Sequence, residues 1–376
     1  MGAVIVGLYV LCSLTALLNL VLMRRPRRDR PALESEIRLC ILIPARNEAE
    51  NLRYLIPALL APNPGLQVIV FDDESEDETA QVAAATGATV VRPSETLPTG
   101  WTGKNRACHE LALAAAKTEA EWFLFLDADV QPKDDFIPAM RSLCRDAWAR
   151  RRIGLVTGFP TILPGKGIEP LFLAWVGWAL LASNPYGLVS RSGLGHNRFK
   201  NGQVHCWKRE VYLRIMPNER VKNRIMEDVE IGRLLAREGV PVEVANLSSV
   251  LSVRMYDHWR ETLDGMSKNS YEITNSDGGS IAVAALLVFL AWGWIFTGSL
   301  WPWALGCFML SGLAVVIMVR TSWWPVLLMP LIPTIGAFTV LRSMLWHRRG
   351  TVRWKGRVYP GRTTVGDKAG STPAES

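Results

Sequence analysis

Trp122-Phe123-Leu124-Phe125-Leu126-Asp127-Ala128-Asp129 is the stretch that decides the fold. Its five uncharged aromatic and aliphatic residues predict a strand that is buried on both faces. Two carboxylates follow at once, at the carboxyl end of that strand, where ligands bind in open α/β sheets. Because side chains alternate along an extended chain, Asp127 and Asp129 point the same way and can face one divalent cation. A polar turn that merely ends the strand is the alternative.

Polar clusters also follow two earlier predicted strands. The strand at 39–43 runs into Pro44-Ala45-Arg46-Asn47-Glu48, and the strand at 68–71 runs into Asp72-Asp73-Glu74-Ser75-Glu76-Asp77. Helices are predicted at 49–60 and 104–117, and strands that alternate with such helices indicate βαβ units in a parallel sheet. Three polar strand ends on one edge of a sheet predict a ligand site there.

An apolar, uncharged run from Ala3 to Met23 precedes Arg24-Arg25-Pro26-Arg27-Arg28. A membrane helix needs about 20 apolar residues. The positive charge follows the apolar run instead of preceding it, so residues 1–23 are expected to form an uncleaved anchor with the amino terminus outside. Residues 24–37 are then a basic linker to a cytoplasmic domain.

Further apolar runs at 281–297, 303–319 and 323–340 predict two or three transmembrane segments within residues 281–343. Three spans would leave the basic tail, residues 344–376, outside, against the positive-inside rule. Because the third run contains Pro325, Pro330 and Pro333, a broken or re-entrant segment is the alternative. The shorter apolar stretch within 164–189 carries Trp175 and Trp178 and predicts an interfacial helix, with a core helix as the alternative.

The overall composition fits one soluble domain joined to membrane segments. The chain has 376 residues, of which 49% are hydrophobic, and a formal net charge of +7. The basic residues stand beside apolar runs, which favours anionic lipid headgroups over nucleic acid as the partner. Six scattered cysteines without a C-x-x-C pair indicate neither a disulfide framework nor a zinc site, as suits a reducing cytoplasm.

Four motifs, in order, resemble the signature of inverting family 2 glycosyltransferases with the GT-A fold. They are Ile43-Pro44-Ala45-Arg46-Asn47-Glu48, Asp72-Asp73-x-Ser75-x-Asp77, Asp127-Ala128-Asp129 and Glu227-Asp228. The resemblance covers residues 38–275 and implies an α/β domain with a mostly parallel sheet flanked by helices. Residues 100–105 and 354–359 are similar, more narrowly, to membrane glycosyltransferases acting on carotenoids, with hopanoid-associated enzymes as relatives.

This resemblance implies a set of residues that bind the nucleotide sugar: Pro44, Ala45, Arg46, Glu48, Asp72, Asp73, Lys104, Arg106, Asp127 and Ala128. Asp73 would accept the uracil imide hydrogen, and Lys104 or Arg106 would contact the diphosphate. Asp129, with Asp127, would hold Mg²⁺ or Mn²⁺. Asp228, beside Glu227, would be the base that takes a proton from the acceptor hydroxyl. Since Met226-Glu227-Asp228 opens a predicted amphipathic helix, a capping role for the two acids is the alternative.

Processive polysaccharide synthases carry a Gln-x-x-Arg-Trp motif, and the corresponding residues here, 254–260, contain no glutamine. This difference indicates transfer of one or a few sugars. Gly202, Gln203, Trp259 and Arg260 are expected to border the acceptor.

We therefore expect a multi-pass plasma-membrane enzyme that moves a hexose, glucose from UDP-glucose, to a carotenoid drawn from the bilayer. A polyprenyl phosphate, hopanoid or diacylglycerol acceptor is an alternative, and a non-catalytic nucleotide-sugar-binding regulator is an alternative of another class.

Overall fold

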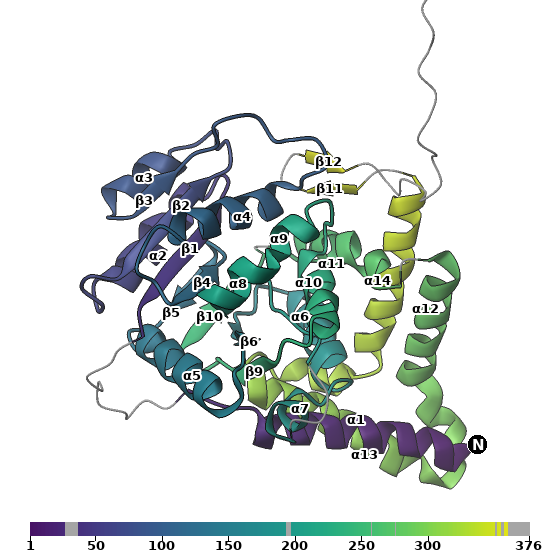
Figure 1. The fold of residues 1–376 in the computed structure, drawn as a ribbon. Coiled ribbons are helices and arrows are strands. Elements are labelled where there is room, and N and C mark those ends of the chain that lie inside the picture. The colour runs from purple at the N-terminus through teal and green to yellow at the C-terminus, as the bar shows by residue number, and fades with distance from the viewer. Residues whose placement is uncertain are drawn as a thin grey trace, which may run out of the picture.

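The computed structural model describes residues 1–26, 37–192, 197–256, 258–274 and 276–349, together with the backbone of 352–354 and 357–359. A seven-stranded sheet forms the centre of the α/β domain, in the order β3-β2-β1-β4-β8-β6-β9 (Figure 1). The strands of this sheet are β1 (Leu39–Ala45), β2 (Gln67–Asp72), β3 (Thr89–Val91), β4 (Trp122–Leu126), β6 (Leu155–Phe159), β8 (Val204–Lys208) and β9 (Val242–Asn246). A smaller sheet joins β5 (Val130–Pro132), β10 (Leu251–Val253) and β7 (Thr161–Ile162).

The predicted central strand is confirmed. All five residues of β4 are buried, and the strand lies between β1, which is parallel to it, and β8, which is antiparallel. Phe123 and Phe125 enter the core on one face of the sheet, whereas Trp122, Leu124 and Leu126 enter the core on the other. The sheet is mostly parallel as expected, and it is mixed because β8 runs antiparallel to both of its neighbours.

The helices of the α/β domain cover both faces of the sheet. They are α2 (Ala49–Leu60), α3 (Thr79–Ala85), α4 (Gly103–Ala115), α5 (Phe136–Arg151), α6 (Glu169–Leu181), α7 (Tyr186–Ser192), α8 (Arg209–Ile215), α9 (Pro217–Arg220), α10 (Glu227–Arg237) and α11 (Trp259–Thr274). Residues of α2, α3 and α5 share the core with Leu124, whereas residues of α4, α6 and α10 share the core with Phe125. The Phe125 core continues into the apolar helices, since Tyr9 and Phe308 belong to it.

The apolar segments outside the domain form two helix pairs. They are α1 (Gly2–Leu22), α12 (Asp277–Trp292), η1 (Gly293–Leu300), α13 (Trp301–Val319), η2 (Trp324–Leu328) and α14 (Leu331–Arg348). Figure 1 shows α1 beside α13 and α12 beside α14, with η1 at the corner where the pairs meet. Among the described residues, three stretches are long and apolar enough to cross a membrane: Gly2–Leu22, Glu169–Ser192 and Asp277–Val319.

The third C-terminal apolar run is broken into two helices. The prolines of this run had indicated a broken segment as the alternative to a continuous span. The short η2 helix is followed by Pro330 and then by α14, which runs antiparallel to α12. Arg348 Nε donates to Asp277 Oδ2 at 2.9 Å at one end of this pair, and Trp292 Nε1 donates to Thr334 Oγ1 at 3.2 Å at the other. The end of α14 therefore lies beside the start of α12. Helix α14 ends at Arg348, five residues after the expected end of the C-terminal apolar segments at 343.

Helix α6 packs against other helices of the protein, whereas its tryptophans had predicted a helix at the membrane interface. Trp178 is buried, and its Nε1 donates to Ser311 Oγ of α13 at 2.8 Å. The ring of Trp175 lies against Gly336 of α14. Because α13 and α14 cover this face, the two indoles contact protein where lipid headgroups were expected. A break at 182–185 separates α6 from α7.

The predicted linker begins as part of the sheet. Arg24 forms a parallel β-bridge with Ala245 of β9, and its Nε lies 3.2 Å from Glu243 Oε2. The rest of that linker from 27 to 36 lies outside the described residues. In the predicted tail, the backbone forms the antiparallel strands β11 (Val352–Trp354) and β12 (Arg357–Tyr359). The remaining tail residues from 360 onward also lie outside the described part.

Candidate functional site

The loops that follow β1 and β2 are bound to each other. Asp73 N–H donates to Ala45 O at 2.8 Å. Further hydrogen bonds between these loops are Asn47 N to Ser75 Oγ (3.0 Å), Glu48 N to Thr79 Oγ1 (2.8 Å), Ala49 N to Asp77 Oδ2 (3.1 Å) and Glu76 N to Asn47 Oδ1 (2.8 Å). Asn47 and Glu74 have φ angles of 54° and 57°. Left-handed backbone at a non-glycine residue costs free energy and is often found at functional sites. The hydrogen bonds between the two loops hold them in this unfavourable conformation.

Asp72 and Asp73 are both buried at this edge, and each has protein partners. Asp72 accepts from Ser75 N–H at 3.1 Å and lies 3.5 Å from Arg92 Nε. Arg46 Nη1 donates to the Asp73 carbonyl at 3.1 Å, and its guanidinium lies 4.0 Å from the Asp73 carboxylate. Arg46 thus fixes the turn that presents Asp73. Pro44 and Ala45 stand at the end of β1 next to that turn.

Lys104 joins the end of β4 to the start of α10. It lies in the first turn of α4, which Thr102 caps by accepting from Asn105 N–H. Its Nζ lies 2.8 Å from Asp127 Oδ1, 2.9 Å from Oδ2 and 3.7 Å from Glu227 Oε1. Burial alone would lower the pKa of Lys104, but the two carboxylates outweigh burial and raise it. The strand end therefore carries a fixed positive charge.

Arg106 lies away from this cluster. Residues two apart on a helix point to different sides, so Arg106 faces the 92–101 loop while Lys104 faces Asp127. Arg106 is buried, and its Nη2 donates to Glu95 O at 2.6 Å. It lines a polar cavity of about 280 Å³ together with Arg92 and Trp101. Of the two candidate cations for the diphosphate, the structure brings Lys104 to Asp127.

Glu227 and Asp228 occupy the first turn of α10 in different surroundings. Glu227 Oε1 lies 3.7 Å from Lys104 Nζ and 3.6 Å from Lys200 Nζ. Burial would raise the pKa of Glu227, yet these two ammonium groups lower it. Burial and the neighbouring Glu227 raise the pKa of Asp228 to about 6. A carboxyl group with such a pKa can accept a proton near neutral pH.

Gly202 stands where these groups meet. A Cβ atom there would lie 3.5 Å from Lys104 Nζ, 3.7 Å from Glu227 Oε1 and 3.9 Å from Asp228 Oδ2. The next residue, Gln203, accepts from Asp127 N–H at 3.0 Å through its carbonyl oxygen. The 197–203 loop thus bonds to the end of β4 and leaves a side-chain-sized space beside the candidate base.

The donor set at the end of β4 suits a hard divalent cation. Asp127 and Asp129 are half-buried, and Ala128 between them is buried. Asp127 already binds Lys104, and Tyr256 lies close enough to Asp129 for the carboxylate to raise the pKa of the phenol, after the larger effect of burial. Within the described residues no three His, Cys, Asp or Glu side chains form a metal cluster. Two carboxylates fit Mg²⁺ or Mn²⁺ if diphosphate oxygens and water complete the coordination.

Trp259 and Arg260 lie at the start of α11. The ring of Trp259 stacks on Phe172 of α6 at 6.1 Å between centroids, and the guanidinium of Arg260 lies 5.3 Å above the Trp259 ring. Trp259 is 37% exposed, and Phe172 belongs to an apolar cluster with Met266 and Leu173. This cluster joins α6 to α11 on the side of the domain that faces α14.

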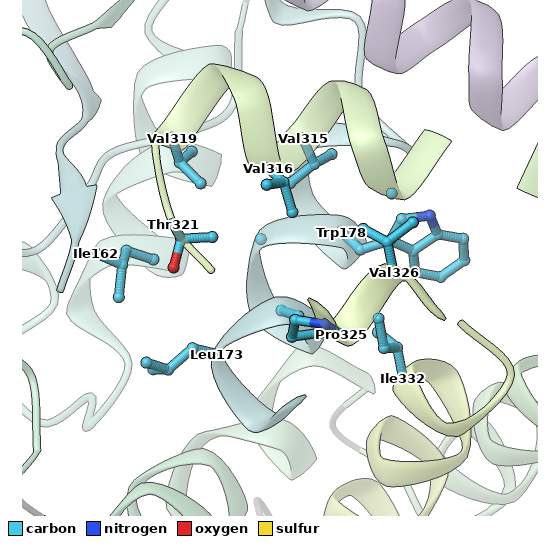
Figure 2. A pocket seen from close by; sticks show the side chains of 13 residues that line it. Ile162, Leu173, Trp178, Val315, Val316, Val319, Thr321, Pro325, Val326 and Ile332 are labelled. Carbon is cyan, nitrogen blue, oxygen red and sulfur yellow. The ribbon is translucent and has the colours of Figure 1, made fainter. Parts of the chain in front are cut away.

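An apolar cavity lies deeper among the apolar helices. Figure 2 shows Leu173 and Trp178 of α6, Val315 of α13 and Pro325 of η2 around it. Its volume of about 10 Å³ is enough for about one water molecule. The cavity is therefore a packing defect and has no room for a lipid chain.

Lys200 and Tyr256 are the site residues that the sequence did not reveal. Lys200 is 1% exposed and contacts Glu227, and Tyr256 faces Asp129. Lys200 is one of many lysines in a basic chain, and only its burial distinguishes it. That burial depends on contacts with residues far away in sequence.

Comparison with known proteins agrees with this geometry. Residues 40–149 match the family model described as glycosyl transferase family 2. A 4,4'-diaponeurosporenoate glycosyltransferase of Staphylococcus aureus (strain USA300) is 26% identical over 345 residues, which cover 85% of this chain and 88% of the relative. The enzyme of the same name from Staphylococcus haemolyticus is 25% identical over 286 residues, covering 75% and 70%.

Among solved structures, the mannosyltransferase PcManGT from Pyrobaculum calidifontis, in complex with GDP-Man and Mn²⁺, has a TM-score of 0.50. The two proteins are 14% identical, and the match covers 92% of this chain and 98% of the mannosyltransferase. At that identity the likeness concerns the fold alone. Residues 40–149 therefore form a glycosyl transferase family 2 domain, in a chain that is similar to glycosyltransferases and has a GT-A-like fold.

Proposed function

We propose that this protein transfers a hexose, glucose from UDP-glucose, to a carotenoid at the cytoplasmic face of a membrane, with inversion at the anomeric carbon. The observation that carries the proposal is the meeting of Lys104, Asp127, Glu227 and Asp228 around Gly202 at the carboxyl edge of the sheet. The name of the staphylococcal relatives supports the acceptor, since their substrate is 4,4'-diaponeurosporenoate.

The donor would lie across the end of β1. Strand β1 pairs with β2 on one side and with β4 on the other, so Asp73 and Asp127 are separated by about two strand spacings, or about 10 Å. That separation suits a nucleoside diphosphate with its base near Asp73 and its diphosphate near Lys104. Pro44, Ala45, Arg46, Glu48 and Asp72 would form the wall of the nucleotide pocket.

Asp228 would act as the general base. Transfer to an acceptor hydroxyl with direct inversion requires one base to take its proton, together with stabilisation of the leaving diphosphate. Lys104 would supply part of that stabilisation through its fixed charge. A divalent ion held by Asp129 and Asp127 would neutralise further charge on the diphosphate.

The apolar helices would place this site at the bilayer. Large side chains are exposed along the membrane segments, including Leu14, Val21, Phe289, Leu313 and Phe338. A soluble protein rarely exposes so much apolar surface, which lipid would cover here. The apolar cluster of α6 and α11 beside Trp259 would receive the acceptor from the bilayer. A polyprenyl phosphate, hopanoid or diacylglycerol would enter the same way and is the alternative acceptor class.

The residues at the helix ends support a cytoplasmic orientation of the catalytic domain. Arg24 and Arg25 follow α1, and Arg320 follows α13, whereas Trp294, Trp301 and Trp303 cluster near the opposite ends. Arginines on the cytoplasmic side and tryptophans at an interface are the usual pattern. Because the end of α14 lies beside the start of α12, the basic tail begins on the same side as the catalytic domain.

The proposal is tested with purified full-length protein, UDP-glucose, Mn²⁺ or Mg²⁺ and carotenoid-containing lipid extract. We expect release of UDP and a hexosylated carotenoid by mass spectrometry. Asp228→Asn should lower turnover by about 10² or more, because it removes the base. Asp146→Asn is the matched control, since Asp146 pairs with Arg150 on α5, away from the site. Full turnover by Asp228→Asn would refute the role of the base.

A further inference from the structure

Lys200 is a fully buried lysine next to the acidic pair of α10. Its side chain is 1% exposed, and its Nζ lies 3.6 Å from Glu227 Oε1. Lys104 Nζ approaches the same oxygen to 3.7 Å. Lysine is almost never buried without a compensating partner, because its ammonium group loses hydration. Glu227 therefore lies between two positive charges that come from different parts of the chain.

The 197–203 loop holds Lys200 in this place. Asn201 N–H donates to Thr157 Oγ1 at 3.0 Å, and Asn197 Nδ2 donates to the Val242 carbonyl at 3.2 Å. These bonds tie both sides of Lys200 to β6 and β9. The loop on either side of the lysine is thus held by the sheet.

The charged groups around Asp228 oppose one another. Burial and Glu227 disfavour the ionised form of Asp228, whereas Lys200 and Lys104 favour it. Lys104 is already bound to both oxygens of Asp127, at 2.8 and 2.9 Å. Lys268 of α11 acts on Glu227 as a weaker positive charge. Lys104 lowers the pKa of Glu227 most and Lys200 follows, so Lys200 shares the neutralisation of Glu227 with a lysine that also holds Asp127.

We propose that Lys200 is a positioning residue for glycosyl transfer: it neutralises Glu227, so that the adjacent Asp228 remains ionised and can accept the proton of the acceptor. The inference rests on the proposed function, in which Asp228 is the base. Lys200 itself is buried and touches no reactant; its charge acts on Asp228 directly as well as by offsetting Glu227.

Lys200→Met tests this role, because methionine keeps an unbranched side chain and removes the charge. We expect the pH midpoint of kcat to rise by about one unit, which lowers turnover below the midpoint roughly tenfold, with recovery at higher pH and an unchanged KM for UDP-glucose. Lys208→Met is the matched control: it removes an ion pair of similar length, 3.8 Å to Glu121, at the far end of β8. Its pH profile should match that of the wild type.

A second pair of variants keeps the test decisive if Lys200→Met does not fold. Glu227→Gln should lower the midpoint, and adding Lys200→Met to Glu227→Gln should raise it again, because the direct effect of the Lys200 charge on Asp228 is lost while no Glu227 carboxylate is left without its partner. A folded Lys200→Met enzyme with the wild-type profile, or a double variant with the profile of Glu227→Gln, would overturn the proposal. Failure of the proposed function looks different, since the wild-type protein would then release no UDP at any pH.

Discussion

The carboxylates of Glu227 and Asp228 are neighbours on one helical turn, yet their pKa values shift in opposite directions. Two ammonium groups surround Glu227, whereas burial and Glu227 itself act on Asp228. Opposed shifts of two adjacent titratable groups are typical of an acid–base site. At the scale of the residue, the environment and not the side-chain type distinguishes the candidate base from its neighbour.

This difference predicts the pH dependence of turnover. Asp228 can act as a base only when its carboxyl group is ionised. Because its pKa is raised to about 6, activity should be lost as the pH falls through about 6, and not at the lower pH where an ordinary aspartate is protonated. We expect kcat to be constant above that pH and to fall about tenfold per unit below it. The measurement is kcat against pH at saturating donor. A profile that stays level down to pH 5 would contradict the assignment of Asp228.

The position of Gly202 beside Asp228 predicts that a larger residue there will lower activity. In Gly202→Ala the added methyl group would lie 3.5 to 3.9 Å from Lys104, Glu227 and Asp228, which is ordinary contact, so the protein should fold. The methyl group would still occupy space needed by the reactants, and we expect kcat/KM to fall roughly tenfold to a hundredfold. Gly278→Ala, which meets nothing within 4 Å, is the control. Equal activity of both variants would place the reactants elsewhere.

At the scale of the element, α1 is more than an anchor. Asn19 in its last turns is fully buried, donates to the carbonyls of Leu181 and Asn184 at 2.8 and 2.7 Å, and accepts from Gly187 N–H at 2.9 Å. Tyr9 OH donates to Leu290 O at 2.8 Å on the opposite side. The helix therefore holds the α6–α7 break and the end of α12 together, while Arg24 extends the sheet.

Asn19→Leu should accordingly destabilise the whole protein. The change leaves buried backbone groups without partners, at a cost of about 1–3 kcal/mol for each group. We expect a clear fall in the unfolding temperature of the detergent-solubilised enzyme, measured by thermal unfolding. Leu18→Ala is the control, because Leu18 is 36% exposed on α1. If both variants unfold alike, α1 serves only as an anchor.

At the scale of the whole molecule, two helix pairs meet at η1 and frame the catalytic domain (Figure 1). Helix α12 leads away from the domain, and α13 returns toward it. The segment from η2 through α14 ends beside the start of α12. The third apolar run is thus broken before α14, and a re-entrant path for it would remove the conflict between three apolar runs and the positive-inside rule.

This path predicts the accessibility of two positions. Ser299 lies in the exposed turn at the meeting point, and Arg320 is exposed at the opposite end of α13. In intact cells, Ser299→Cys should react with a membrane-impermeant maleimide, and Arg320→Cys should react only after lysis. Labelling of the wild-type protein gives the background from its free cysteines. The reverse pattern would place the catalytic domain outside the cytoplasm.

The sequence by itself determined the elements whose signals are local. The apolar run of β4, the helix at 49–60 and the acidic start of α10 follow from periodicity and end signals within each segment. The fold class followed because those elements alternate. The motifs at the strand ends indicated the ligand edge, since parallel strands must bring their carboxyl ends together.

Only the tertiary structure decided which side chains meet. Lys104, Asp127, Lys200 and Glu227 are far apart along the chain, and no local pattern pairs them. The same holds for Trp178, which binds Ser311 inside the protein. The return of α14 likewise depends on the contact between Arg348 and Asp277. Burial and ion pairing arise from long-range packing, whereas sequence periodicity records only which face of an element is apolar.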